Sequence, residues 1–588
     1  MSSLQSKATL VKETQSVRIG SRYRPERVAE LIKDSDIDHL VIGSGVGGLI
    51  CAAALAKVGR KVLVLEQHYT AGGFTHSYLR KGYEWDVGVH YVGQVGNKKT
   101  LPGALFHWLS EGRLEWDSLG ACYDAFDIAG KRYQLPVGKS AFKRYLLKQF
   151  PDDAGAIVEY CQLLFHVERW LPFFFSSKIS SLSWLNGDWL NAGWLNGKWF
   201  DSSLFNKIRI KSSADLIKRN IPQAFYQTTA EVLDDLTDNK TLKAVLTAQW
   251  GDAGLPPGQS SFFLHCLIAN HYLAGAWYPK GGSSQIAESL LPTIEGAGGK
   301  VMTYAEVEGI VLDDTEQASV AGVKMADGHI IKCDSVISGC GWYNTQKLLP
   351  ENALPAINKE VAPQQIEPSA CHICLYVGFE ESPQALKIPT NNLWVHRSEN
   401  YDADCAQLTE GATTDLPFVY ISSSAARDST WNQRYPDKAV MELVAVIPYR
   451  EFEPWSGTDW GKRGDDYEAK KEYWSEKLLL TLYQHFPQLK GKVTYYELST
   501  PLSTEHFMNY PRGEIYGLAH TPRRYQQEGL KPTTNIHGLT LVGQDALTSG
   551  VVGAAISGAI GAGEILGADT KRTLMRPVKW LTSWVKTV

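Results

Sequence analysis

Residues 38–48 read DHLVIGSGVGG, and this stretch decides the fold of the chain. A short apolar run leads directly into a G-x-G-x-x-G motif, which small apolar residues follow. The pattern predicts a strand, a tight turn and a helix, and residues 61–65 supply a second apolar strand. In such a βαβ unit Gly43 permits the turn, Gly45 lets a pyrophosphate approach the backbone, and Gly48 lets the helix and the strand pack closely.

The second strand ends in an acidic residue, Glu66, about 20 residues beyond the glycine turn. At this position a carboxylate can accept hydrogen bonds from both ribose hydroxyls of an adenosine. The N-terminus of the first helix adds free backbone N–H groups and the positive end of the helix dipole, which favour phosphate. Together these features predict a dinucleotide site in a Rossmann-type unit. A glycine-rich turn that holds no ligand is the alternative.

Composition limits what else the chain can do. With 44% hydrophobic and 21% charged residues it has the make-up of a globular protein, and 588 residues suffice for several structural units. The net charge of −4 argues against a nucleic-acid partner, which needs a basic face. The 9 cysteines are scattered, which favours a reducing compartment over a disulfide scaffold. Cys371 and Cys374 form a lone C-x-x-C whose thiols would point to opposite faces of a strand, so we expect no metal site.

The segment after Glu66 indicates FAD rather than NAD as the dinucleotide. It continues with Gln67 and reaches the pair Gly72-Gly73. A Gly-Gly pair at this position resembles the extended signature of FAD-containing amine oxidases and phytoene desaturases, in which it lets a second loop approach the FAD. We expect Gln67 and, from a later strand, Val307 to belong to the same cofactor site.

The C-terminal region resembles these flavoenzymes as well. It contains the segments Gly543-Gln-Asp545 and Gly550-Val-Val-Gly553. The resemblance implies that Gly543 belongs to the cofactor site and that Asp545 holds the ribityl chain of FAD. It also implies that a helix N-terminus near Gly553 points at the flavin pyrimidine, where its dipole stabilises the negative charge of the reduced ring. No second G-x-G-x-x-G follows a strand, so no separate NAD(P)H domain is predicted, and NAD(P)H stays open as the electron donor.

We therefore expect an α/β fold: a Rossmann-type FAD-binding domain with an inserted mixed α+β substrate domain. The expected ranges are 1–36 for an N-terminal arm, 37–105 for the first FAD-binding piece, 106–270 for a helical and aromatic insertion, 271–345 for the second FAD-binding piece, 346–530 for the substrate-domain sheet, 531–570 for the third FAD-binding piece and 571–588 for an amphipathic terminal helix.

The two ends of the chain bear on its expected location. Residues 1–20 contain no apolar h-region, and no stretch of the chain reaches the roughly 18 apolar residues of a spanning helix. Residues 573–588 place Leu574, Val578 and Leu581 at helical spacing beside basic residues. Such a helix can lie in the headgroup plane of a membrane, and docking on the core is the alternative. We expect a cytoplasmic protein that is peripheral to a membrane.

Further motifs carry a narrower resemblance, which runs from about Asp38 to Gly567. They are Val41-Ile-Gly-Ser-Gly45 with Leu63-Val-Leu-Glu-Gln-His68, Asp86-Val-Gly-Val-His90-Tyr91-Val-Gly93, Tyr278-Pro-Lys-Gly-Gly-Ser-Ser-Gln-Ile-Ala287, Thr430-Trp431 with Arg434, Gly461-Lys-Arg-Gly464 with Asp466-Tyr467, Phe486-Pro-Gln-Leu-Lys-Gly-Lys492, Pro511-Arg-Gly513 with Tyr516-Gly517, and Gly543-Gln-Asp545. These motifs resemble the retinol saturase (all-trans-retinol 13,14-reductase) family, within the carotenoid isomerase and phytoene desaturase superfamily.

The resemblance implies an FAD-dependent oxidoreductase that acts on C=C bonds of an apolar conjugated lipid, which would be a retinoid, a carotenoid or a polyunsaturated fatty acyl chain. Hydride from reduced flavin adds to one carbon, the charge spreads along the conjugated chain, and an acid protonates the neighbouring carbon. His90 and Tyr91 follow the FAD loop and are the candidate catalytic residues. A flavin hydrogen bond or simple packing remains open for His90.

Three reactions would use the same flavin and the same apolar pocket. The first is reduction, as in a retinol saturase. The second is carotenoid cis–trans isomerisation with reduced FAD and no net redox change, and the third is a phytoene-type desaturation. The mass of the product separates them, because reduction adds two hydrogens, desaturation removes two and isomerisation changes nothing. The sequence leaves the oligomeric state open.

Overall fold

The computed structural model describes residues 18–33, 35–178, 222–313, 318–357 and 366–567. The terminal helix expected at 571–588 lies outside these ranges. Within them, no helix combines the length and the apolar character needed to cross a membrane. The same ranges contain no group of three or more His, Cys, Asp and Glu side chains that could hold a metal ion.

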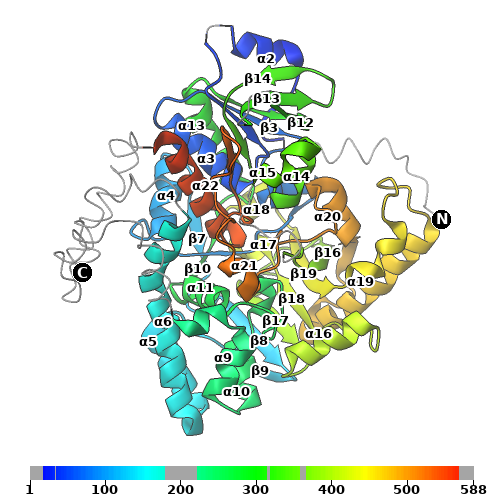
Figure 1. Ribbon diagram of the computed structural model, residues 1–588. Helices are drawn as coiled ribbons and strands as arrows, with labels where there is room; N and C mark the ends of the chain where they lie inside the picture. Colours follow the sequence, from blue (N-terminus) through cyan, green and yellow to red (C-terminus); the bar gives the residue numbers. More distant parts are fainter. Residues whose placement is uncertain (1–17, 34, 179–221, 314–317, 358–365, 568–588) are drawn as a thin grey trace, which may run out of the picture.

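A six-stranded parallel sheet forms the first half of the molecule (Figure 1). Its strands β2 (His39–Ile42) and β3 (Val62–Glu66) are buried along their whole length, as is typical of parallel strands covered on both faces. The strand order is β1 (Ser21–Arg22), β11 (Lys300–Thr303), β3, β2, β15 (Val336–Ser338) and β21 (Leu539–Leu541). Segments far apart in the chain therefore form one Rossmann-type sheet, which confirms the predicted fold class.

Two helices rich in small residues pack against each other beside this sheet, α3 (Val46–Ala56) and α22 (Gly550–Leu566). They approach closely because glycines meet at the contact: a Cβ atom on Gly558 would lie 2.3 Å from the carbonyl oxygen of Gly47. A Cβ atom on Gly48 would lie 2.4 Å from the carbonyl oxygen of Gly43, in the turn between β2 and α3. The last glycine of the motif thus has the packing role that the sequence predicts.

A seven-stranded, mainly antiparallel sheet forms the second half. Its strand order is β20 (Val493–Ser499), β16 (Cys371–Phe379), β19 (Ala439–Ile447), β18 (Phe418–Ser422), β17 (Asn392–His396), β8 (Asp124–Ile128) and β9 (Lys131–Gln134). We expected this sheet only within 346–530, whereas β8 and β9 come from 106–270. The early strands carry a weak sequence signal because β9 is an exposed edge on which Tyr133 is buried and its three neighbours are not.

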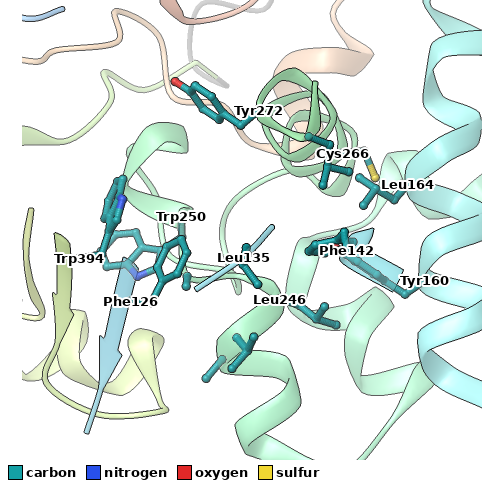
Figure 2. Close-up of a cluster of buried hydrophobic side chains, with 14 of the residues drawn as sticks. Phe126, Leu135, Phe142, Tyr160, Leu164, Leu246, Trp250, Cys266, Tyr272 and Trp394 are labelled. Carbon is teal, nitrogen blue, oxygen red and sulfur yellow. The ribbon is translucent and has the colours of Figure 1, made fainter. Parts of the chain in front are cut away.

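Helices from the expected insertion lie beside the second sheet (Figure 1). They include α5 (Lys139–Gln149), α6 (Ala154–Ser177) and α11 (Phe262–Leu273), and α6 packs against both of the others. Figure 2 shows the buried side chains between these helices and the sheet, among them Phe142 and Tyr160 on the helices and Trp394 on β17. The aromatic side chains that the structure describes on these helices therefore contribute to a hydrophobic core.

The described part of the N-terminal segment differs from the arm expected at 1–36. Residues Ser21–Arg22 pair in parallel with Met302–Thr303 as the edge strand β1. A short helix, α2 (Pro25–Leu31), follows and buries Val28. Two residues of strand are too short to produce a periodic pattern, so the sequence alone gave no reason to place them in the sheet.

Candidate functional site

A cavity of about 900 Å³ lies between the two sheets, near the top of the roughly 300–1,000 Å³ range of ligand pockets. One part of its wall consists of glycine-rich turns at the carboxyl ends of β2, β3 and β15. We call this part the cofactor half; its lining residues fall within 42–47, 65–75, 305–307, 339–340 and 543–554. The other part is the substrate half, with lining residues within 90–91, 167–175, 251–272, 394–420 and 444–446.

Ser44 and Glu66 connect the two loops of the cofactor half. Ser44 donates to Glu66 Oε2 from its backbone N–H at 2.8 Å and from its hydroxyl at 2.6 Å. The N–H of Gly72 then donates to the Ser44 hydroxyl at 3.1 Å, which ties in the second loop. A Cβ on Gly73 would lie 3.1 Å from Gly45 Cα, whereas the Cβ position of Gly45 has no atom within 4 Å. The loops thus meet at glycines, and Gly45 leaves room for a ligand to approach the backbone.

Glu66 has the acceptor chemistry that a ribose diol requires. It ends β3, lines the cavity and is 8% exposed. Its Oε1 atom accepts one hydrogen bond, from the N–H of His68 at 2.8 Å. A carboxylate oxygen accepts at about two positions, so Oε1 can receive a further donor. Gln67 and Val307, the first residue of β12 (Val307–Leu312), also line the cavity.

Two helix N-termini border the cavity. The first residues of α3 follow Gly45, and those of α22 follow Ser549; neither of these N-cap residues makes a side-chain cap hydrogen bond. Their first backbone N–H groups are therefore available to a ligand, and the helix dipoles favour negative charge there. Gly543 and Gly553 line the cavity on the same side. The N-terminus of α22 therefore borders the cavity, and its orientation toward a flavin ring stays a prediction.

Asp545 has a different place from the one expected. It does not line this cavity, and both of its carboxylate oxygens accept backbone hydrogen bonds. The N–H of Trp342 donates to Oδ2 at 2.8 Å and the N–H of Leu518 donates to Oδ1 at 2.9 Å. The carboxylate therefore joins the loop after β15 to a loop of the substrate domain. Because Asp545 does not line the cavity, its position gives no support to the expected hydrogen bond with a ribityl chain.

His90 and Tyr91 both line the cavity, yet neither is suited to donate a proton directly. Burial, with a smaller effect of Arg427, lowers the pKa of His90 to about 3, so its imidazole is neutral. Burial raises the pKa of Tyr91 well above its ordinary value. The Tyr91 hydroxyl is also engaged, since it lies 3.1 Å from a carboxylate oxygen of Asp124 and 3.1 Å from one of Asp252.

Sequence reasoning missed Asp252, which lines the cavity in the substrate half. It lies in a short 3-10 turn, η6 (Trp250–Ala253), and its local sequence matches no catalytic motif. Its neighbours come from other elements: Asp124 begins β8, and Tyr91 follows the FAD loop. The only available signal is a charged residue next to a tryptophan and two small residues, which does not by itself indicate a site.

The rest of the substrate half is apolar and aromatic. Side chains from the seven-stranded sheet and from α11 and α6 face the cavity, among them Trp394, Phe418, Tyr420, Val444, Leu267, Ile268, Leu171 and Phe175. Such a wall accepts a long apolar molecule and excludes water from it. The apolar pocket predicted from the sequence is therefore present in the substrate half.

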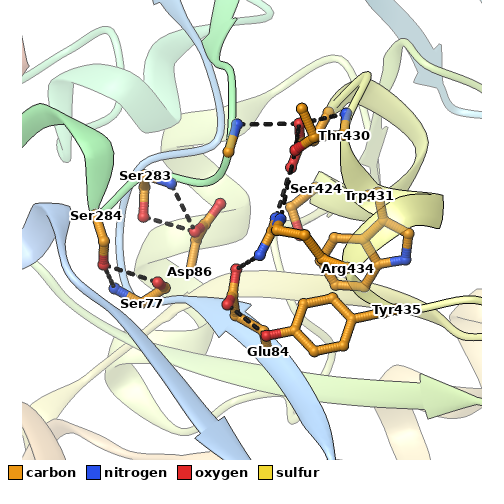
Figure 3. A network of polar contacts seen from close by, with 12 residues as sticks. Ser77, Glu84, Asp86, Ser283, Ser284, Ser424, Thr430, Trp431, Arg434 and Tyr435 are labelled. Carbon is orange, nitrogen blue, oxygen red and sulfur yellow. Dashed lines mark hydrogen bonds and ion pairs between the residues drawn. The ribbon is translucent and has the colours of Figure 1, made fainter. Parts of the chain in front are cut away.

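A polar network joins the two halves of the molecule outside the cavity (Figure 3). Arg434 donates to Glu84 at 2.7 Å and to Asp428 at 2.6 Å. Asp86 accepts from the hydroxyls of Tyr278 at 2.5 Å and Ser283 at 2.6 Å. Several motifs that carry the narrower resemblance, around Asp86, Tyr278 and Arg434, therefore lie close together. The hydrogen bond from Arg434 links this segment of the substrate domain to Glu84.

The residues present fit FAD. The cradle has open space at Gly45, two uncapped helix N-termini for negatively charged groups, and an acceptor carboxylate at Glu66. Dinucleotide phosphates and the ribose of an adenosine require these groups in this arrangement. Gly43, Gly45, Gly72, Gly73 and Gly543 line the cavity, and Gly48 packs α3 against the turn beside it.

Comparison with protein families agrees with this geometry. A family model described as flavin containing amine oxidoreductase matches residues 46–566. The chain is 33% identical over 548 residues to an all-trans-retinol 13,14-reductase of Danio rerio, covering 90% of this chain and 86% of the relative. It is 30% identical to an inactive all-trans-retinol 13,14-reductase of Danio rerio, covering 90% of this chain and 86% of that protein.

More distant relatives and solved structures extend the comparison. A chloroplastic prolycopene isomerase of Daucus carota is 24% identical, covering 97% of this chain and 87% of the relative. Among solved structures, a putrescine oxidase variant has a TM-score of 0.56 at 14% identity, covering 90% of this chain and 99% of that chain. At this identity the structural match speaks for the fold alone.

Proposed function

The chain belongs to the flavin containing amine oxidoreductase family and, within it, to the all-trans-retinol 13,14-reductases, and on this basis we propose that it reduces a C=C bond of a conjugated apolar lipid. The predicted family and the predicted oxidoreductase class are thereby confirmed. A retinoid is the proposed substrate. One observation carries the proposal: a dinucleotide cradle and a long aromatic and aliphatic wall face each other across one cavity.

Bound FAD, once reduced, would supply the hydride for this reaction. The chain's own residues do the rest. Gly43, Gly45 and Glu66 bind and orient the cofactor, and the N-terminus of α22 favours negative charge beside it. The apolar wall around Trp394 and Phe418 aligns the polyene and keeps water away, which favours a conjugated substrate over an isolated alkene.

The deciding experiment follows product mass under anaerobic conditions. Protein loaded with FAD is reduced with dithionite and mixed with all-trans-retinol, and the molecular mass of the extracted lipid is measured by mass spectrometry. A gain of two hydrogens supports the proposal. An unchanged mass for every polyene tried, including carotenoid precursors and polyunsaturated fatty acids, would overturn it. Because one relative is named as inactive, this measurement on the chain itself is essential.

A carotenoid isomerase is the second candidate, and the similarity to prolycopene isomerases supports it. Reduced FAD and the same apolar wall would serve this reaction. The same incubation separates the two functions, since isomerisation changes the retention time of the product on a column and leaves its mass unaltered. A phytoene-type desaturase would instead remove two hydrogens from a substrate when the flavin starts oxidised.

We further propose NAD(P)H as the electron donor and a peripheral position on a membrane surface. Bleaching of the flavin absorbance by NADPH or NADH without oxygen would test the donor, and bleaching by dithionite alone would exclude both. For the membrane, the basic and apolar sequence of residues 573–588 supports the proposal. Deleting these residues should move the protein from the membrane pellet to the soluble fraction, and an unchanged pellet would contradict it.

A further inference from the structure

One tyrosine hydroxyl lies between two aspartate carboxyl groups at the edge of the substrate half. The Tyr91 oxygen is 3.1 Å from Oδ2 of Asp124 and 3.1 Å from Oδ2 of Asp252. Asp252 lines the cavity, whereas Asp124 is fully buried and does not line it. The three residues are far apart in the chain, so the grouping is a product of the fold.

The number of hydrogens available for hydrogen bonds indicates which of Tyr91, Asp124 and Asp252 is protonated. Asp124 accepts from the side-chain amides of Asn392 at 2.6 Å and Gln249 at 2.7 Å, so it is well supplied with donors as a carboxylate. Tyr91 has one hydroxyl hydrogen and cannot donate it to two carboxylates. Were both aspartates ionised, one of the two contacts would bring two acceptors together in a buried site. Both contacts are hydrogen bonds when Tyr91 donates to Asp124 and a protonated Asp252 donates to Tyr91.

The electrostatic surroundings favour the same assignment. Burial and the Asp124 carboxylate raise the pKa of Asp252 to about 8, and the Tyr91 hydrogen bond opposes the rise. Arg427 touches the group through Asn392, whose side-chain oxygen accepts from the guanidinium. The other titratable groups that interact with Asp252 are tyrosines whose pKa values are raised, so they are neutral: Tyr91, Tyr123, Tyr272, Tyr420 and Tyr516.

The wall next to Asp252 is aromatic. The Tyr272 ring stacks on Tyr91 with centroids 4.3 Å apart, and a Cβ on Gly251 would lie 2.7 Å from atoms of Trp394 and Phe418. Figure 2 shows Tyr272, Trp250 and Trp394 in this region. An apolar chain that fills the substrate half therefore meets a neutral carboxylic acid at this wall.

We propose that Asp252 is the acid that donates the proton to the lipid substrate, with Asp124 and Tyr91 as positioning residues: the Asp124 carboxylate favours the protonated form of Asp252, and the Tyr91 hydroxyl orients it. This inference rests on the proposed reduction of a C=C bond. It assigns the proton-transfer role to a residue that no sequence motif indicates, and it gives Tyr91 a supporting role in place of a direct one.

The step balances in atoms and electrons. One carbon of the double bond gains the hydride, which comes from reduced FAD, and the π-electron pair moves onto the conjugated chain. The O–H bond of Asp252 breaks as a C–H bond forms at the neighbouring carbon. Tyr91 then turns its hydrogen from Asp124 to the new Asp252 carboxylate, while Asp124 keeps the Asn392 and Gln249 donors. Water returns a proton to Asp252, and a two-electron donor of the NAD(P)H class restores the reduced cofactor.

The first test detects the proton on Asp252 by infrared spectroscopy and does not require catalytic turnover. Infrared difference spectra between the flavin-loaded wild type and D252N should contain the C=O stretch of a protonated carboxyl group at pH values well below 8. That band should disappear above pH 8, as the carboxyl group ionises. The matched control is D402N, because Asp402 is a half-buried aspartate that binds the N–H of Gly258 at 2.9 Å and does not line the cavity. A wild-type spectrum without an Asp252-dependent band would overturn the inference, whatever the activity.

The second test follows the reaction of dithionite-reduced enzyme with all-trans-retinol in a stopped-flow instrument. D252N should bind FAD normally and return its flavin to the oxidised form roughly 10²–10³-fold more slowly, as expected for the loss of a general acid. D252E should recover part of the rate, and D402N should match the wild type. The wild-type rate should fall as the pH rises through about 8, because the acid form is lost. In Y91F this fall should move to higher pH, because the Tyr91 hydrogen bond lowers the pKa of Asp252.

The outcomes separate the two proposals. If the wild type reduces retinol and D252N is equally fast, the role of Asp252 fails and the proposed function stands. If the infrared band is present and the wild type changes no polyene, the proposed function fails and takes the proton-donor role with it. In D2O, deuterium is expected at the carbon that receives the acid proton, because the carboxyl proton of Asp252 exchanges with solvent. Absence of deuterium from the product would contradict the inference.

Discussion

The cofactor half of the cavity is built mainly from backbone, and the substrate half mainly from side chains. Around Gly45, Gly73 and the first turn of α22, N–H groups and open space replace side chains. Across the cavity, Trp394, Phe418 and the Tyr91–Asp252 pair provide the surface. A backbone site depends on the conformation of a few consecutive residues, whereas a side-chain site depends on which distant elements the fold brings together. Each variant below tests one part of this contrast.

Gly48→Ala should have the largest effect in the cofactor half. Its new Cβ would lie 2.4 Å from the carbonyl oxygen of Gly43, which cannot move without distorting the turn. We expect a loss of about 3 kcal/mol in unfolding free energy, the upper part of the usual overpacking range, together with loss of bound flavin. Thermal unfolding and flavin absorbance per mole of protein measure both.

The matched control for Gly48 is Gly155→Ala in α6, where the Cβ position has no atom within 4 Å. This variant should keep its flavin and its stability, because helix propensity favours alanine by up to about 1 kcal/mol. Equal behaviour of the two variants would show that close backbone approach does not shape the cofactor half.

Glu66→Gln should weaken the binding of FAD without unfolding the protein. The amide keeps the size of the side chain but exchanges one acceptor oxygen for a donor, next to the donors of Ser44 and His68. A hydrogen bond to a charged group contributes about 1.5–3 kcal/mol, so the Kd of FAD should rise roughly 10- to 100-fold. Fluorescence titration of the apoprotein measures it, with the exposed Glu111→Gln as a control. An unchanged Kd would place the ribose elsewhere.

Asp545→Asn should lower the free energy of unfolding more than it weakens the binding of FAD. One of the N–H groups of Trp342 and Leu518 would face an amide donor, and an unsatisfied buried group costs about 1–3 kcal/mol. Urea unfolding should show this loss, while the Kd of FAD changes far less than in Glu66→Gln. The opposite pattern, stable protein with weakly held FAD, would restore the ribityl role expected from the sequence.

His90→Gln should have the smallest effect on the reaction. The pKa of His90 is lowered to about 3, so the ring is neutral throughout the working range and its loss removes no acid. The rate of flavin reoxidation should change far less than the roughly 100-fold expected for a general acid, and its pH profile between pH 5 and 7 should be unaltered. A drop as large as that of D252N, or a changed acid limb, would return the catalytic role to His90.

The cofactor half could be read largely from the sequence because its determinants are contiguous. The glycines from Gly43 to Gly48 and the acidic end of β3 specify strand, turn and helix locally, and the structure arranges them as the motif predicts. The resemblance to the retinol saturase family was confirmed for the same reason, since whole motifs survive in order along the chain. Asp545 shows the limit of such prediction. Its position in a motif did not reveal that two backbone N–H groups donate hydrogen bonds to its carboxylate.

The substrate half was harder to predict from the sequence because its elements come from separated segments of the chain. Strands β8 and β9 join a sheet whose other strands begin more than two hundred residues later, and an exposed edge strand has little apolar pattern. No sequence motif around Trp250 indicates that Asp252 takes part in proton transfer. Its burial and its neighbours exist only after folding.

By itself, the sequence determined the class of fold, the dinucleotide cradle and the family, because each of these follows from short runs of residues whose backbone conformation is set locally. Only the tertiary structure decided which ionisable groups share a proton. Tyr91 reaches Asp124 across 33 residues and Asp252 across 161, and the protonation of a carboxyl group is set by water exclusion and by charges within a few ångströms.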